Sequence, residues 1–183
     1  MKLPNIKILD EKNKKLREIS KEVTFPLSKE DQQIIKDMLD YLEMSQIEKY
    51  REKYDLRAGM GLAYIQIGIP KRIFVIVDEV EEGVFERHVV INPKIISMSE
   101  ELIYVGEGEG CLSINRETEG IVPRHARLKI EAYDETGELY TIRVREDLAV
   151  AFQHEIDHLN GILFIDHIDP KNPFKDADKM REL

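Results

Sequence analysis

The sequence predicts an α+β fold, with largely antiparallel β-sheets around a helix near the C-terminus and an amphipathic helix near the N-terminus. Three observations lead to this class. Apolar residues recur at helical spacing after Ser28, β-branched residues fill several short segments in the middle of the chain, and a second helical segment stops at Asn160-Gly161. Because the predicted strands cluster together and do not alternate with helices, a parallel doubly wound sheet is not expected.

The first helix is predicted from Ser28 to about residue 50. Ser28 and Asp31 have the spacing of a capping box, with Asp in place of the usual Glu or Gln. The apolar residues that follow at helical spacing are Ile34, Ile35, Met38, Leu39 and Leu42. We therefore expect an amphipathic helix with a charged outer face.

Strands are predicted at residues 72–77, 89–97, 128–133 and 139–144, which are rich in β-branched or alternating apolar residues. Asn92-Pro93 marks a bend or an edge position in the second of these strands. The last two strands flank Asp134-Glu135-Thr136-Gly137, which predicts a hairpin turn. Residues 162–168 also have β character.

The length and composition indicate a soluble, globular protein with a single domain over residues 1–183. The net charge is −9, from 27 basic and 36 acidic residues, which disfavours general binding to nucleic acid or anionic membranes. No apolar run approaches the ~20 residues that span a bilayer, and the N-terminus has no apolar signal core. The single cysteine, Cys111, fits a reducing compartment, so we expect a cytoplasmic protein.

The second helix is predicted from Asp147, as its N-cap, to Asn160-Gly161, and it contains His154-Glu155-Ile156-Asp157-His158. Positions i and i+4 lie on one face of a helix, so both imidazoles can bind one metal ion. Glu155 projects about 100° around from His154 and can reach a water on that ion. This is the arrangement that metal-assisted hydrolysis needs. The alternative is a chance pattern of surface or core histidines.

A metal site needs a third protein ligand, and the candidates are Cys111, His88, His125, His167 and the many carboxylates. Cys111 stands in a segment, residues 106–113, where glycines allow the main chain to approach a ligand closely. A thiolate there would complete a Cys-His-His site with one position open. The alternative is a glycine-rich surface loop with an incidental thiol.

A second glycine segment, residues 59–66, superficially resembles a dinucleotide-binding fingerprint. Tyr64 stands where the third glycine belongs, and the segment precedes a strand instead of joining a strand to a helix. That interpretation is therefore rejected.

Taken together, three segments resemble the motifs of the peptide deformylase family. They are Gly59-Met60-Gly61-Leu62-Ala63-Tyr64-Ile65-Gln66, Glu109-Gly110-Cys111-Leu112-Ser113 and Gln153-His154-Glu155-Ile156-Asp157-His158-Leu159. Their order and their separation of roughly 45 residues match the family, and the long first helix resembles its second bacterial subtype. The first segment departs from the family, which usually has Ala at the position of Tyr64 and often Pro at that of Ile65.

The resemblance implies an enzyme that hydrolyses the formyl group from the N-terminal formyl-methionine of new polypeptides and releases formate. The implied ligands of one divalent ion are Cys111, His154 and His158. Fe2+ is the family's usual native metal, and Zn2+, Ni2+ or Co2+ can substitute. Metal-bound water would attack the formyl carbon with Glu155 as general base. The side-chain amide of Gln66 and the backbone N–H of Leu112 would stabilise the negative oxygen.

The resemblance also implies how the substrate is held. The expected substrate-binding residues are Gly59, Met60, Gly61, Gly110, Val150 and Ala151, with Met60, Val150 and Ala151 forming the pocket for the methionine side chain. Asp157 would orient a neighbour, and Glu109 with Arg124 would brace the cysteine loop. The expected partners are N-formyl-methionyl peptides near the ribosome exit, with no direct nucleic acid, no membrane and a monomeric state.

Two other functions fit parts of the sequence. A zinc protease of the His-Glu-x-x-His class would take a ligand downstream, such as His167, and would leave Cys111 without a role. A non-catalytic relative could bind a peptide in the same groove, and only Tyr64 hints at it. The three ordered motifs favour the deformylase.

Overall fold

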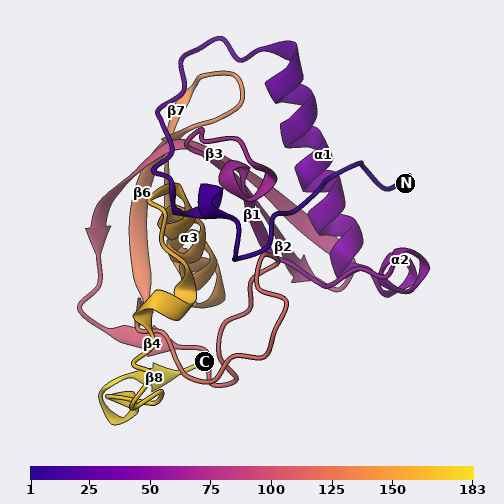
Figure 1. The fold of residues 1–183 in the computed structure, drawn as a ribbon. Coiled ribbons are helices and arrows are strands. Elements are labelled where there is room, and N and C mark those ends of the chain that lie inside the picture. Colours follow the sequence, from indigo (N-terminus) through magenta and orange to yellow (C-terminus); the bar gives the residue numbers. More distant parts are fainter.

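The structure is a computed structural model that describes residues 1–183, and it combines two β-sheets with three α-helices (Figure 1). In the larger sheet every neighbouring pair of strands is antiparallel. Its strands, in spatial order, are β1 (Gly61–Ala63), β2 (Ile73–Glu81), β3 (Val84–Met98), β6 (Arg127–Tyr133) and β7 (Leu139–Arg145). The predicted α+β class with a largely antiparallel sheet is confirmed.

The larger sheet is buried on both faces of β2. Ile73, Val75 and Val77 pack in the cluster that contains α1 (Lys29–Gln46). Phe74 and Ile76 point to the other face, where they join the cluster built around α3 (Glu146–Leu159). This explains why the segment reads as a continuous apolar run and not as an alternating one.

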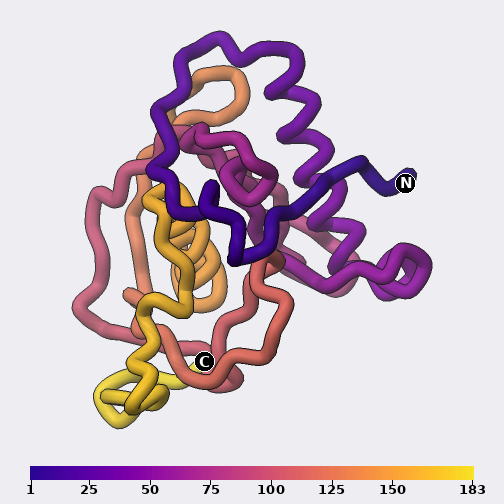
Figure 2. The backbone as a smooth tube through the Cα atoms, in the orientation of Figure 1, coloured from indigo at the N-terminus to yellow at the C-terminus, as the bar shows by residue number.

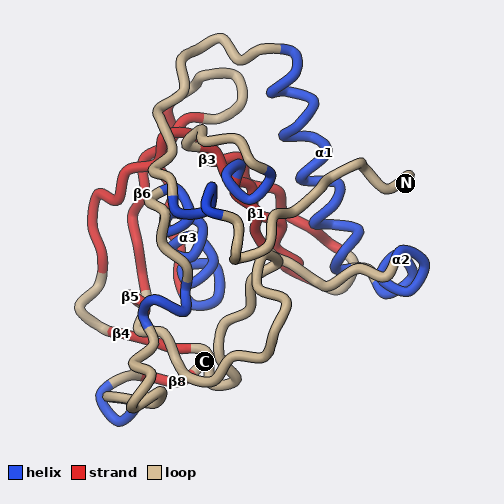
Figure 3. Tube along the Cα trace, viewed as in Figure 1, coloured by secondary structure: helices blue, strands red, loops and turns tan.

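The smaller sheet has the order β5 (Arg124–His125), β4 (Leu102–Tyr104) and β8 (Arg181–Glu182), and lies at the end of the molecule where the C-terminus is found (Figure 3). β4 pairs antiparallel with β5 and parallel with β8. Leu183 follows β8, and its N–H donates to the Tyr104 carbonyl at 2.9 Å. The Leu183 side chain packs on the small cluster that includes Val150 of α3.

The predicted first helix begins where expected but ends earlier. The Ser28 hydroxyl accepts a hydrogen bond from the Asp31 N–H at 3.0 Å, as a helix cap does. The reciprocal half of the capping box is absent, because the Asp31 carboxylate pairs with Lys71 at 2.7 Å. α1 stops at Gln46, since Ile47 is extended, and the separate helix α2 (Glu48–Tyr54) follows.

The four predicted strands are all present, and the hairpin between β6 and β7 turns at Asp134–Gly137. The bend expected at Asn92-Pro93 is a register shift between Ile91 and Lys94 within β3, where Asn92 has φ 50. The Asn92 side chain fixes this bend through hydrogen bonds to the backbone of Val23, at 2.8 and 2.9 Å.

Two expectations near α3 are wrong. Asp147 is not the N-cap, because β7 runs directly into α3 at Arg145 and the helix starts at Glu146. Asp147 lies instead in the first turn, where a carboxylate suits the helix dipole. The β character expected for residues 162–168 is also absent, since Phe164–His167 forms a 3₁₀ helix. A local bond from the Leu163 N–H to the Asp166 carboxylate, 3.0 Å, favours that turn over a strand. The stop at Asn160-Gly161 is confirmed.

The N-terminal segment crosses the molecule and bonds to all three motif regions (Figure 2). The Leu9 N–H donates to the Gln66 carbonyl at 2.7 Å, and the Glu11 N–H donates to the Ser113 carbonyl at 2.7 Å. Further along, the Ser20 N–H donates to the carbonyl of Leu159, the last residue of α3. These bonds join segments that are far apart in the sequence.

Tyr64, the aromatic residue that departs from the family pattern, is fully buried. Its ring packs in the cluster between α1 and the sheet, and its hydroxyl donates to the Asp31 carbonyl at 3.0 Å. Tyr64 therefore fills space beneath α1 and does not line the cavity described below.

We expect Tyr64→Phe to lower the free energy of unfolding by about 1 kcal/mol, because it leaves the buried Asp31 carbonyl without this donor. Urea unfolding would measure the change. Catalytic rates should stay unchanged, and a rate loss without a stability loss would contradict this placement of Tyr64.

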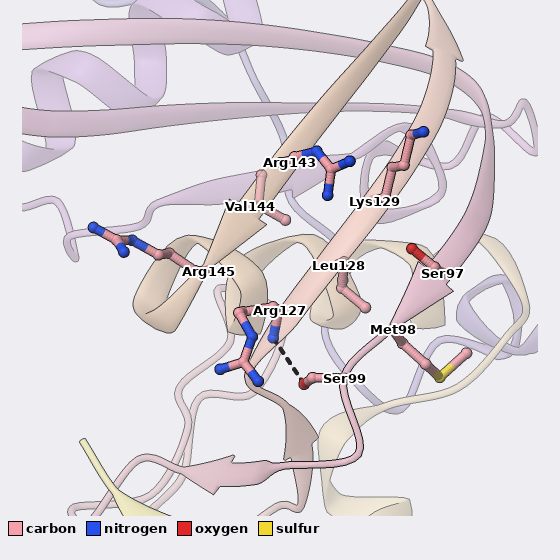
Figure 4. Close-up of a pocket in the computed structure, with 9 residues that line it drawn as sticks. All are labelled: Ser97, Met98, Ser99, Arg127, Leu128, Lys129, Arg143, Val144 and Arg145. Atoms are coloured by element: carbon pink, nitrogen blue, oxygen red, sulfur yellow. Dashed lines mark hydrogen bonds between the residues drawn. The ribbon is translucent and has the colours of Figure 1, made fainter.

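A basic hollow of about 420 Å³ lies on the outer face of β3, β6 and β7, where Arg127 faces Arg145 and Lys129 faces Arg143 across the two strands (Figure 4). Ser97 and Ser99 leave room beside these long side chains. No carboxylate lies within 4.0 Å of Lys129, Arg143 or Arg145. The hollow is separate from the motif residues.

Like charges directly opposite each other destabilise a β-hairpin. Arg143→Glu should therefore raise the free energy of unfolding by about 0.5 kcal/mol, by creating an attractive pair with Lys129. Urea unfolding at low and high salt would test this, because salt should shrink the gain. Arg143→Gln is the control that only removes repulsion, and a destabilised Arg143→Glu chain would contradict the prediction.

No helix in the structure has the length and the apolar character required to span a membrane.

Candidate active site

The three motif segments meet at one place beside α3. Residues 59–63 pass along β1 and lead into a short 3₁₀ helix that carries Gln66. The cysteine segment is a turn closed by a hydrogen bond from the Ile114 N–H to the Cys111 carbonyl, at 3.0 Å. α3 supplies His154, Glu155 and His158 from one side of the helix.

Cys111, His154 and His158 form a group that can hold a metal ion, because one ligand atom from each lies within 4.8 Å of the others. Cys111 Sγ and His158 Nε2 are 3.4 Å apart. A thiolate and two imidazoles suit zinc, iron and similar divalent ions. The three side chains are enclosed by the fold, so the geometry fits a small cation.

The other histidines considered as ligands lie elsewhere. His88 packs against Phe152 with ring centroids 6.0 Å apart. The His125 ring contacts the Ser99 carbonyl at 2.7 Å, and the His167 ring contacts Asp157 at 2.8 Å. The downstream ligand that a zinc protease would need is therefore absent from the cluster.

A buried network of ion pairs contacts the ring of His154. Glu109 Oε1 lies 2.9 Å from His154 Nδ1, which leaves the other ring nitrogen for an ion. Arg124 donates to Glu109 at 2.8 and 2.9 Å and to Asp157 at 2.7 Å. Burial alone would raise the pKa of Glu109, but the bonds from His154 and Arg124 lower it to about 2. The sequence-based ion pair of Glu109 and Arg124 is thus present, and Asp157 belongs to the same network.

Burial and neighbouring groups shift the pKa values of His154 and His158 in opposite directions. Burial disfavours a charged His154, yet Cys111 and Glu109 raise its pKa well above the ordinary value. Burial and the neighbouring His154 lower the pKa of His158, whose Nδ1 is buried without a partner. The pocket therefore stabilises one positive charge between Cys111 and Glu109, and a bound cation would take the place of that proton.

Glu155 lines the cavity together with Cys111 and His154, and is only 3% exposed. Its Oε2 atom is buried and has no hydrogen-bond partner. Burial raises the pKa of Glu155 to about 7, so the carboxyl group can exchange a proton near neutral pH. Gly61 allows this placement, since a Cβ there would lie 2.6 Å from Glu155 Oε1.

The cavity itself has a volume of about 220 Å³. Every residue expected to bind substrate lines it, namely Gly59, Met60, Gly61, Gly110, Val150 and Ala151. Val105, Gly108 and Asp147 complete the wall and were not anticipated from the sequence. Leu183 and Val105 pack on the same small cluster as Val150, so the C-terminal strand supports this wall from behind.

Gln66 contacts Cys111 from the 3₁₀ helix after β1, and Leu112 follows Cys111 in the chain. Gln66 is 1% exposed, its Oε1 accepts from the Ala63 N–H at 2.9 Å, and its Nε2 donates to the Ser113 hydroxyl at 3.1 Å. Nε2 is also 3.6 Å from Cys111 Sγ. The Leu112 N–H makes no hydrogen bond within the chain, and neither Leu112 nor Gln66 is among the residues that line the cavity.

Sequence reasoning missed Ser113 and Arg57. Ser113 holds the Gln66 amide, and Arg57 donates to two carbonyls of the cysteine turn. Nothing in the sequence around Arg57 distinguishes it from the charged residues nearby, because a hydrogen bond to a distant carbonyl cannot be inferred from the local spacing of residues.

Comparison with known proteins identifies this arrangement. The family model described as polypeptide deformylase matches residues 6–174. The chain belongs to the polypeptide deformylase family. The predicted family and the predicted hydrolase class are thereby confirmed.

Individual deformylases are similar over most of the chain. The peptide deformylase of Latilactobacillus sakei is 47% identical over 175 residues, which cover 94% of this chain and 95% of the relative. Peptide deformylase 2 of Bacillus anthracis is 44% identical over 92% of this chain and 91% of its own, in agreement with the second bacterial subtype. The solved structure of a probable peptide deformylase from Synechococcus phage S-SSM7 has a TM-score of 0.74 at 34% identity, over 90% of this chain and 100% of that one.

Proposed function

We propose that the chain removes the formyl group from the N-terminal formyl-methionine of new polypeptides, using one divalent metal ion. The observation that carries the proposal is the cluster of Cys111, His154 and His158 beside a cavity that Cys111, His154 and Glu155 line. Membership of the polypeptide deformylase family supports the same reaction.

The proposed ligands are Cys111, His154 and His158, held from behind by Glu109. When bound, a divalent ion supplies a Lewis acid that makes water more acidic and polarises the formyl oxygen. Fe2+ is proposed as the native ion, with Zn2+, Ni2+ or Co2+ as substitutes, because a thiolate and two imidazoles accept all four.

Glu155 is proposed as the general base. Its side chain lines the cavity, one of its oxygens has no hydrogen-bond partner, and its pKa of about 7 lets it hold or release a proton at physiological pH. It would take a proton from the attacking water and return it to the departing amine nitrogen, so one carboxyl group serves both halves of the hydrolysis.

Attack on the formyl carbon places negative charge on the formyl oxygen. We propose as donors to it the Leu112 N–H, which has no partner within the chain, and the Gln66 amide, whose Nε2 lies 3.6 Å from Cys111 Sγ. We expect Gln66→Ala to lower kcat by about 10²-fold with little change in bound metal, because one oxyanion donor is lost. Steady-state assays with metal analysis would measure both. An unchanged kcat would remove Gln66 from the mechanism.

Met60, Val150 and Ala151 are proposed to enclose the methionine side chain, and the backbones at Gly61 and Gly110 would bond the peptide like an added strand. The proposed substrates are N-formyl-methionyl peptides that emerge at the ribosome exit. A cytoplasmic location, a monomeric state and no direct contact with nucleic acid or membrane are proposed with them.

The proposal is tested by anaerobic purification, metal analysis and an assay of formate release from formyl-Met-Ala-Ser. About one metal ion per chain with rapid formate release is expected. Metal without formate release would favour a non-catalytic peptide-binding relative. Protein that binds no metal under these conditions would refute the Cys111-His154-His158 site.

A further inference from the structure

Arg57 joins the two walls of the active site. It stands two residues before Gly59, and its guanidinium donates through Nη2 to the Cys111 carbonyl and through Nη1 to the Ile114 carbonyl, each at 2.9 Å. No salt bridge involves Arg57, and these two carbonyls are its only side-chain hydrogen-bond partners. Its positive charge is therefore directed at the backbone of the cysteine turn.

The Cys111 carbonyl belongs to the same peptide unit as the Leu112 N–H. A trans peptide is rigid and planar, and its C=O and N–H point in opposite directions. A donor that fixes the carbonyl oxygen on one side therefore fixes the direction of the N–H on the other. A charged donor on the oxygen also polarises the unit, which makes the N–H a stronger donor.

The Leu112 N–H makes no hydrogen bond within the chain, so its peptide unit is held at the Cys111 carbonyl, which accepts from the Ile114 N–H of the turn and from Arg57. The Leu112 side chain is restrained separately by the opposite wall, since a Cβ at Gly59 would lie 2.6 Å from Leu112 Cδ1. Gly59 is itself held by Ser45, whose hydroxyl accepts from the Gly59 N–H at 3.1 Å. Arg57 is thus the side chain that acts on the peptide unit.

We propose that Arg57 is a positioning residue for the reaction, which orients and polarises the Cys111–Leu112 peptide so that the Leu112 N–H stabilises the negative oxygen. This inference rests on the proposed function, because it assigns a cause to one of the two oxyanion donors. It predicts a contribution that appears when charge develops on the substrate, and not when the substrate binds.

A purely structural role would have different consequences. If Arg57 only fastened the loop, its loss would lower the melting temperature or the metal content, and any rate loss would follow the bound metal. Arg116 offers a matched control, because it is another arginine near the cysteine turn, and it joins this region to the N-terminal segment. It pairs with Glu11, whose N–H bonds to the Ser113 carbonyl, but it does not touch the Cys111–Leu112 peptide.

The test compares the unsubstituted chain with Arg57→Met, Arg57→Lys and Arg116→Met, loaded with the same metal. We expect Arg57→Met to lower kcat per bound metal by about 10- to 50-fold, which is less than the loss of a whole oxyanion donor. KM for formyl-Met-Ala-Ser should stay within about twofold. The kcat of Arg57→Lys should lie between those of Arg57→Met and the unsubstituted chain, because an ammonium keeps the charge but cannot donate to both carbonyls in the same geometry. The kcat and KM of Arg116→Met should match those of the unsubstituted chain.

The inference is overturned if kcat per bound metal is unchanged in Arg57→Met, or if Arg116→Met loses as much. If Arg57→Met fails to fold, Arg57→Lys decides, since a lower kcat at constant KM supports the role and an unchanged kcat refutes it. An unsubstituted chain that releases no formate would refute the proposed function itself, which is a separate outcome.

Discussion

Glu155→Gln is expected to lower kcat for formate release by about 10³-fold while bound metal stays near that of the unsubstituted chain. Glutamine keeps the shape of the side chain in its buried position against Gly61, but it cannot accept the proton of the attacking water. Formate release and metal content measured on the same preparation would separate loss of the base from loss of the ion.

Glu107→Gln is the matched control for that experiment. Glu107 is exposed on the loop that leads to the cavity, so its substitution removes the same charge without touching the base. Its kcat should stay within about twofold of the unsubstituted chain, as is usual for a surface change. Retention of a tenth or more of the activity by Glu155→Gln would show that another group moves the proton.

Cys111→Ser is expected to reduce bound metal far below one per chain and to lower formate release by about 10³-fold or more. Changes behind a ligand already reduce metal affinity by about 10- to 100-fold, so loss of a ligand should reduce it further. A neutral hydroxyl also removes the negative charge that Cys111 would contribute beside His154 and His158. Metal analysis after gel filtration would measure the loss.

Thermal unfolding provides an independent test of metal binding at the cluster of Cys111, His154 and His158. An ion that binds only the folded chain raises its stability, so a chelator should lower the melting temperature of the unsubstituted protein. Cys111→Ser should show little response to the chelator. An equal response in both proteins would mean that the ion binds somewhere other than the cluster of Cys111, His154 and His158.

The sequence was most informative where chemistry depends on local spacing. His154 and His158 are one helical turn apart, so their shared face follows from the helix alone. The Ser28 cap and the Asp134–Gly137 turn are likewise local, and the structure has both. The fold class and the antiparallel arrangement of the strands followed from the clustering of the predicted strands in the sequence.

What the sequence could not supply depends on contacts between distant residues. The 3₁₀ helix at Phe164–His167 begins with apolar, β-like residues, but the Leu163 N–H donates to the Asp166 carboxylate, and this bond favours the turn. The direction of Tyr64 was equally hidden, since only the tertiary structure shows that its hydroxyl reaches α1. Arg57 contacts the cysteine turn although Cys111 lies 54 residues further along the chain, and no periodic pattern in the sequence predicts such a contact.

The path of the N-terminal segment has a consequence for the order of folding. Its hydrogen bonds reach Gln66, Ser113 and the carbonyl of Leu159, so part of the chain made first is held by the part made near the end. Such contacts close long loops and form late, because the entropy of closure must be overcome before they stabilise anything. The ion would be captured between Cys111 and His158, 47 residues apart, only once α3 has formed. A nascent copy of this chain would then lack the complete metal site until α3 has been synthesised and has folded against the cysteine turn.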